Sequence, residues 1–354
     1  MKINISYETV TRMFELCKKH KEGKLNRTEL EAILDHKDYQ VEIERYNNEA
    51  GPGGKFSKEE YVEYFMNFFQ LEESNIKQPM LRFRYSQLKY FFDNIDGYEE
   101  KVDKIKNITE DDVRQALERT HFGLPDNIRF DELNLIFSIG LGASQGWFYK
   151  NYAHLDLVKF LEEIDSINTV IAHECHHIGL NKMCENLDIT QISPEESLYL
   201  FLAFEGLAVK YCNNGEGLLT KKIYDDTANI GLDEFTWDYL TKEFHNIYMN
   251  FKSQIDKIRS GEIKDIDDLN KYIAGYWMSL YTDDQDRNEI PRLHHSRNYS
   301  FGNEVWGLIH DVYGREKVFE TLKNPKQFPE VFNSALKEIG RTDLLSEEVV
   351  KKSW

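Results

Sequence analysis

The residues most suited to chemistry lie together in the segment 171–179, which contains a His-Glu-x-x-His pattern. His173 and His177 stand four positions apart, and Glu174 directly follows the first of them. On an α-helix, residues four apart share one face, so both imidazoles can bind one Zn²⁺ at about 2.0–2.1 Å. Glu174 is rotated by about 100° from His173, beside the ion, where it can take a proton from a zinc-bound water. The pattern predicts the active-site helix of a zinc metallopeptidase.

A third metal ligand is predicted in the next helix. Ser193 and Glu196 have capping-box spacing at its start, and the apolar pattern continues to about Cys212. Residues 197–209 carry one charged side chain, Glu205. A carboxylate on such an apolar face costs several kcal/mol to ionise unless it meets a positive partner. The zinc ion is one such partner, which would leave the fourth position for water. A buried lysine or arginine is the alternative.

Other candidates for the third ligand follow from the same segment. A metzincin would need glycine at position 180 and histidine at position 183, where this chain has Leu180 and Met183. That class is excluded. Cys184 is the second choice, but it faces the ion only if the histidine helix continues past Gly179, where we expect it to end, with Asn181 as a second end signal.

Three short strands are expected immediately before the histidine helix. Apolar and β-branched residues indicate strands at 133–139, 147–149 and 153–157, with a flexible turn at 140–146. The edge of such a sheet could bind an extended peptide by strand addition, although an ordinary hairpin covering the core fits the pattern equally well. His154, in the third strand, is expected to be structural rather than a ligand.

A donor for the oxyanion of a tetrahedral intermediate is sought near the start of a late helix. Residues 290–299 look irregular, and a helix is expected over 300–313. Tyr299 is the first choice for this donor, with His295 and Arg297 as alternatives. The other possibility is that these are ordinary surface residues.

Composition limits the class of protein and of partner. The chain has 354 residues, 41% of them hydrophobic, and its net charge is −18. Mean hydropathy is −0.60, and no apolar run approaches the roughly 20 residues of a membrane span. The charge argues against nucleic acid and anionic membranes as partners, and the start of the chain lacks a signal-peptide pattern, so a cytoplasmic protein is expected. The four cysteines are scattered without C-x-x-C pairing and are expected to be reduced thiols: Cys17, Cys175, Cys184 and Cys212.

The metal motif resembles that of the gluzincin metallopeptidases. The His173–His177 pattern is followed, in the next predicted helix, by Glu205-Gly206-Leu207-Ala208. More narrowly, it is similar to uncharacterised bacterial families described as zinc-dependent peptidases, in which a Tyr-x-x-Gly helix comes later. Tyr299-Ser300-Phe301-Gly302 matches that part loosely. The resemblance covers about residues 130–335. It implies that His173, His177 and Glu205 bind zinc and that Glu174 is the general base, although the third glutamate comes later here than in thermolysin-like gluzincins.

We interpret the chain as a mostly helical α+β protein with a small antiparallel sheet beside a zinc-binding helix pair. Residues 1–125 are expected to form a helical N-terminal lobe, and residues 126–354 the metallopeptidase-like catalytic region. The predicted function is zinc-dependent hydrolysis of peptide bonds in a peptide or protein substrate. One alternative is a scaffold with a structural zinc that acts as a binding module, which a closed four-ligand site would favour. Another is hydrolysis of a non-peptide amide.

Overall fold

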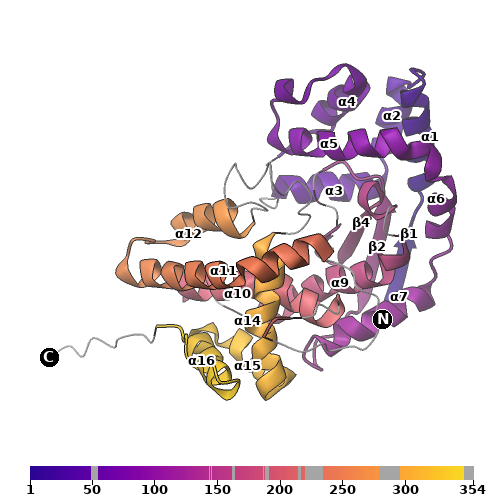
Figure 1. Ribbon diagram of the computed structural model, residues 1–354. Coiled ribbons are helices and arrows are strands. Elements are labelled where there is room, and N and C mark those ends of the chain that lie inside the picture. The colour runs from indigo at the N-terminus through magenta and orange to yellow at the C-terminus, as the bar shows by residue number, and fades with distance from the viewer. Residues whose placement is uncertain are drawn as a thin grey trace. The chain divides into compact units, whose positions relative to one another are not determined.

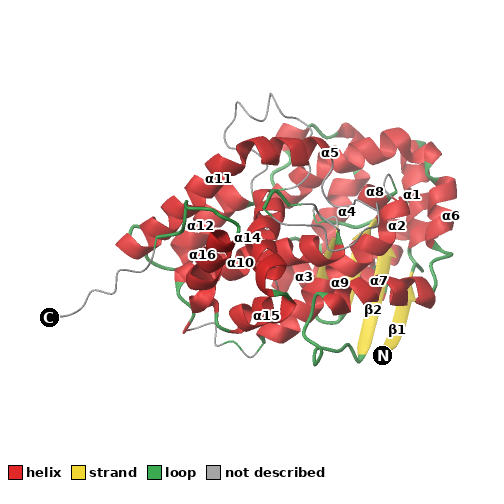
Figure 2. Ribbon diagram, turned by 60° about the horizontal axis from the view of Figure 1, so that its bottom comes forward, coloured by secondary structure: helices red, strands yellow, loops and turns green. Residues whose placement is uncertain are grey.

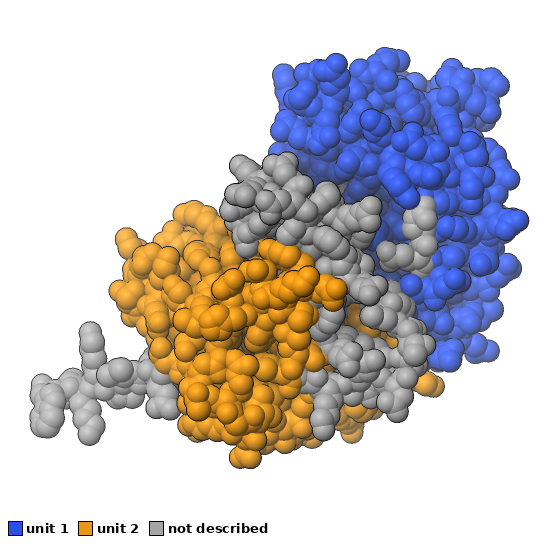
Figure 3. Space-filling model, in the orientation of Figure 1, with its two compact units in different colours: residues 1–117, 130–178 blue, residues 118–129, 179–354 orange. Residues whose placement is uncertain are grey.

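The structure, a computed structural model, divides into two compact units (Figure 3). Unit 1 consists of residues 1–117 and 130–178, and unit 2 of residues 118–129 and 179–354. The residues that the structure describes are 1–48, 55–142, 144, 146–161, 164–185, 187, 191–213, 217–219, 234–278 and 296–346.

Helices make up most of the described chain, as predicted (Figure 2). The α-helices that begin in unit 1 are α1 (Val10–Lys21), α2 (Arg27–Leu34), α3 (Lys37–Asn48), α4 (Lys58–Met66), α5 (Pro79–Asn94), α6 (Glu99–Ile105), α7 (Glu110–Phe122), α8 (Leu157–Phe160) and α9 (Ile167–Cys184). Those of unit 2 are α10 (Pro194–Cys212), α11 (Glu234–Ser260), α12 (Ile266–Tyr272), α14 (Arg297–Tyr313), α15 (Arg315–Lys323) and α16 (Phe328–Glu338). A π-helix, η6 (Ile273–Trp277), follows α12, and the 3₁₀ turns are η1 (Phe68–Gln70), η2 (Glu73–Asn75), η3 (Ile95–Gly97), η4 (Ile164–Ser166) and η7 (Pro325–Gln327).

Unit 1 contains a four-stranded sheet in the order β1-β2-β4-β3. Its strands β1, β2 and β4 are labelled in Figure 1. Its strands are β1 (Lys2–Ser6), β2 (Glu132–Ser138), β3 (Gly146–Tyr149) and β4 (Tyr152–Asp156). β2 runs parallel to both β1 and β4, and only β3 pairs antiparallel, with β4. The predicted antiparallel sheet is therefore wrong, and the sheet is mixed. A tight turn at Lys150, where φ is 55°, makes β3 and β4 antiparallel. Because β3 lies outside β4, the chain reverses direction once between β2 and β3 and again between β3 and β4, so β4 runs parallel to its other neighbour, β2.

The first strand was not expected from the sequence, which predicts helices throughout residues 1–125. β1 pairs with β2 in register, Ile3 opposite Leu133 and Ile5 opposite Leu135. Asn4 supports the pairing, because its Nδ2 donates to Glu132 Oε1 at 2.7 Å. The alternation of apolar and polar residues in this short segment is the signal that could have revealed the strand.

The histidine helix α9 is longer than the sequence predicts. It continues through Gly179, the expected end, to Cys184. A Cβ atom at position 179 would lie 2.1 Å from Leu124 Cδ1. Gly179 therefore serves close packing against Leu124 rather than helix termination.

The helix that carries Glu205 begins as predicted. Ser193 and Glu196 form a complete capping box, and Pro194 occupies the first turn of α10. Ser193 N donates to Glu196 Oε2 at 2.8 Å, while Glu196 N donates to Ser193 Oγ at 3.2 Å. These bonds satisfy backbone donors that the first turn of a helix leaves unpaired.

Within unit 2, α10 packs closely against α14. The two backbones touch where Gly206 meets Gly302, because a Cβ on Gly206 would lie 2.1 Å from the Gly302 carbonyl carbon. Trp306 Nε1 also donates to the Tyr199 carbonyl at 3.0 Å. Among the described residues, no helix has both the length and the apolar composition to cross a bilayer.

Candidate metal centre

His173 and His177 lie one turn apart on the same face of α9. Their ring centroids are 4.7 Å apart, and the rings are nearly perpendicular, with an angle of 84° between their planes. Both side chains are buried, with 6% and 4% of their surface exposed. The four-residue spacing therefore brings two imidazoles together, as the sequence predicts.

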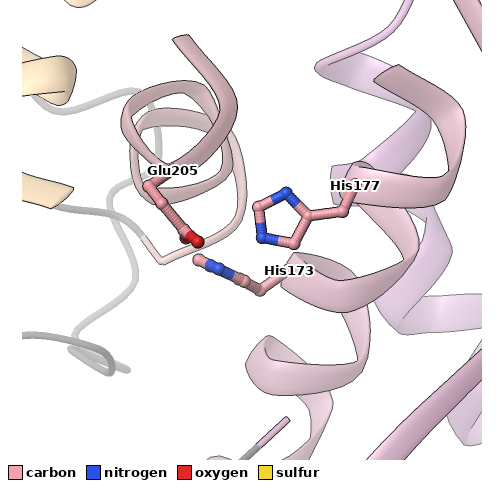
Figure 4. Close-up of side chains that lie close together, drawn as sticks. All are labelled: His173, His177 and Glu205. Atoms are coloured by element: carbon pink, nitrogen blue, oxygen red, sulfur yellow. The ribbon is translucent and has the colours of Figure 1, made fainter. Parts of the chain in front are cut away.

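Glu205 extends from the middle of α10 toward the two histidines (Figure 4). One carboxylate oxygen of Glu205 and one nitrogen from each imidazole all lie within 4.8 Å of one another. Among the described histidine, cysteine and acidic residues, these three form the group that could hold a metal ion. Cys184, the second choice for a ligand, is not part of this group.

The donor atoms of this group fit a zinc ion. Two imidazole nitrogens and one carboxylate oxygen are a known protein ligand set of catalytic zinc sites, which keep a fourth position open. Magnesium and calcium prefer oxygen ligands, so the two imidazoles argue against either ion.

Glu174 is buried beside the histidines but does not belong to the metal-binding group. Its side chain has 8% of its surface exposed. Its carboxylate lies over the start of β3, because a Cβ added to Gly146 would be 2.2 Å from Glu174 Oε1. The position of Glu174 in the helix agrees with a carboxylate beside the ion rather than bound to it.

His154 is a core histidine, as expected. It is fully buried in β4, and its Nε2 lies 2.7 Å from Ser138 Oγ. Its ring stacks on Trp147, with centroids 4.5 Å apart. Burial lowers the pKa of His154 well below its usual value, and Arg45 and Arg84 add to the effect, so the ring is neutral at physiological pH.

The candidates for the oxyanion donor have different surroundings. Tyr299 lies in the first turn of α14 and is half-buried. Arg297, the first residue of α14, is buried, and its Nη1 donates to the Tyr276 carbonyl at 3.1 Å. Its guanidinium also lies over the Tyr276 ring, so it links α14 to η6. His295 lies outside the described residues. The role of Tyr299 stays a prediction.

Two residues of β3 border the site and were not predicted to do so. Gly146 meets the carboxylate of Glu174, and the Phe148 ring packs against His177 with centroids 5.4 Å apart. They are two positions apart in a strand, so they share one face. The sequence predicted a strand at 147–149, but alternation with a period of two residues does not show which helix packs against each face of the strand.

A protein family matches the part of the chain that contains the three residues of the metal-binding group. The family described as "Putative zinc dependent peptidase (DUF5700)" matches residues 30–231. The chain belongs to this family. The matched range contains His173, His177 and Glu205, whereas Tyr299 lies beyond it. No curated protein and no solved structure matches the chain.

Proposed function

We propose that this protein is a zinc-dependent peptidase of the gluzincin type that cleaves peptide bonds. In this proposal His173, His177 and Glu205 hold the ion, and Glu174 is the general base. The observation that carries the proposal is the convergence of the three ligand atoms within 4.8 Å of one another. Membership of a family described as zinc-dependent peptidases supports the same conclusion.

Each residue of the proposed site has its own chemical role. When bound, zinc supplies Lewis-acid polarisation of the scissile carbonyl and lowers the pKa of a water molecule towards about 7. The two imidazoles and the Glu205 carboxylate would hold the ion. Glu174 accepts a proton from the attacking water and later donates it to the leaving amine. Tyr299 would donate a hydrogen bond to the oxyanion.

The substrate would bind as an extended strand. β3 lies at the edge of the sheet, so one side of its backbone is not paired within the sheet. Gly146 and Phe148 of this strand contact Glu174 and His177. A peptide that adds to this edge would therefore run past the base and the metal ligands, which supports a peptide or protein as the substrate.

Substitution of the base separates metal binding from turnover. Glu174→Gln keeps the size of the side chain and leaves all three proposed ligands in place. We expect it to retain one zinc per chain and to lose hydrolysis of a quenched fluorogenic peptide library by several orders of magnitude, because proton transfer is lost. Zinc content and initial rates, measured on the same preparations, provide the test. A zinc-loaded variant that turns over like the wild type would contradict the assignment of Glu174.

A further inference from the structure

The edge strand β3 has two faces with different partners. Gly146 and Phe148 face α9, where they meet Glu174 and His177. Trp147 points the other way and stacks on His154 of β4. The strand therefore contacts the proposed catalytic helix through alternate residues, and its other face is available to fix it in place.

Helix α3 holds that other face. The Arg45 guanidinium lies 5.4 Å from the centroid of the Trp147 ring. Tyr149 Oη donates to Glu44 Oε1 at 3.0 Å, and Asn48 Nδ2 donates to Tyr149 Oη at 3.3 Å. Because α3 packs against the face of β3 opposite α9, β3 cannot move away from α9 without displacing α3.

Three described residues before β3 bind two further residues of α3. Leu141 N and Gly142 N donate to Glu42 Oε1 at 2.9 and 3.1 Å. Ser144 N donates to Tyr46 Oη at 3.0 Å. Leu141, Gly142 and Ser144 are thus anchored to α3 just before β3, and the strand itself is attached to the same helix.

At Gly146 the backbone comes so close to Glu174 that an added side chain would displace the carboxylate. A Cβ there would lie 2.2 Å from Glu174 Oε1, 2.8 Å from Cδ and 3.2 Å from Cγ. Separations below about 3 Å are not sustained by real Cβ atoms. The strand is anchored and the carboxylate is on a side chain, so the carboxylate would have to move.

We propose that Gly146 is a positioning residue for Glu174. Because Gly146 has no side chain, there is space beside the anchored strand, and the Glu174 carboxylate is held in that space. This inference rests on the proposed function insofar as Glu174 is the general base. Displacement of a reacting group by about 1 Å can lower a rate by about 100-fold. Gly146 would then influence proton transfer without itself touching the reacting atoms.

A double-mutant cycle tests the contact without reference to activity. Gly146→Ala should lower the Tm measurably in the wild-type background, because the added methyl must displace the buried Glu174 carboxylate. In a Glu174→Ala background the same change should lower the Tm by much less, since the obstructing atoms are gone. The matched control is Gly97→Ala, because a Cβ at position 97 has no atom within 4 Å. An equal Tm decrease in both backgrounds would overturn the proposal.

Measurements of kcat and zinc content test whether Gly146 affects the proposed base, Glu174. Gly146→Ala should lower kcat by about 100-fold, retain one zinc per chain and leave KM close to the wild-type value. Gly97→Ala should behave like the wild type in all three. Wild-type kcat for Gly146→Ala, measured where Glu174→Gln is inactive, would overturn the proposal. If Glu174→Gln is fully active, the proposed base is wrong, and the double-mutant cycle alone decides whether Gly146 positions Glu174.

Discussion

A buried carboxyl group, Glu42, supports the segment that leads to the site. It is 1% exposed and accepts hydrogen bonds from the backbone of Leu141 and Gly142. Burial raises the pKa of Glu42 to about 7, and the nearby carboxylate of Asp156 contributes to the rise. The Arg84 guanidinium forms a buried ion pair with Asp156 and opposes the rise. The protonation state of Glu42 is therefore linked to folding.

The free energy of unfolding should fall as pH rises from 4.5 to about 7, the interval set by the pKa of Glu42. The pKa of Glu42 is about 7 in the folded chain, against an ordinary value of 4.5, so the folded state binds its proton more tightly. The resulting stabilisation is complete below pH 4.5 and is lost as pH rises towards 7, with an upper bound of roughly 3 kcal/mol. Glu42→Gln keeps an acceptor oxygen but cannot ionise. Urea unfolding at pH 5 and pH 8 should therefore show a smaller decrease for this variant.

A second buried carboxyl group, Glu304, should contribute to the same loss of stability as pH rises. Burial raises its pKa to about 7 as well, and it accepts hydrogen bonds from Leu218 N and Leu219 N. Glu42→Gln should therefore remove only part of the decrease. An identical loss of stability between pH 5 and pH 8 in the variant and the wild type would show that Glu42 does not titrate in this range.

The three residues of the candidate metal centre could be predicted because their signals are local. His173 and His177 follow from helical spacing, and Glu205 from a single charge on an apolar helix. The contact of Gly146 with Glu174 has no such signal. It depends on how a strand and a helix pack, and a glycine after a flexible segment looks like part of a turn.

At the scale of the element, the position of Glu205 depends on how α10 crosses α14. The neighbouring residue, Gly206, lies against Gly302, and a Cβ on Gly302 would be 2.2 Å from the Leu202 carbonyl oxygen. Backbone atoms on both sides leave no side chain that could rotate away. A larger residue at this crossing must shift a helix, and Glu205 would shift with α10.

Gly302→Ala should therefore weaken zinc binding as well as stability. We expect a loss of about 1–3 kcal/mol in the free energy of unfolding, as for other overpacked cores, and zinc affinity reduced by about tenfold or more. Competition with a zinc-selective chelator measures the affinity, and urea unfolding of the zinc-free protein measures the stability. Gly275→Ala is the control, because a Cβ at position 275 has no atom within 4 Å. If Gly302→Ala is destabilised but keeps the zinc affinity of the wild type, the metal site does not depend on the crossing of α10 and α14.

Elements with strong end signals could be predicted, and those defined by distant contacts could not. The capping box at Ser193 correctly indicated the start of α10. Gly179 misled the prediction of the end of α9, because its packing partner Leu124 is distant in sequence. β1 has a short local alternation of apolar and polar residues, but five residues are a weak signal, and its partner β2 begins only at Glu132.

At the scale of the whole molecule, the acidic composition affects any metal analysis. The chain has 62 acidic residues against 44 lysines and arginines. Exposed carboxylates bind divalent ions weakly, so total zinc in a crude preparation does not report on one site. The specific site is expected to differ from this background, because it combines two buried imidazoles with Glu205.

The most direct test is the zinc content of the purified protein and of Glu205→Ala after dialysis against a zinc buffer that removes weakly bound ions. Mass spectrometry of the metal should find about one zinc per wild-type chain. The variant should lose it, with affinity lowered by more than about 100-fold, because one of three protein ligands is missing. Equal zinc content in the two proteins under these conditions would contradict a site built from His173, His177 and Glu205.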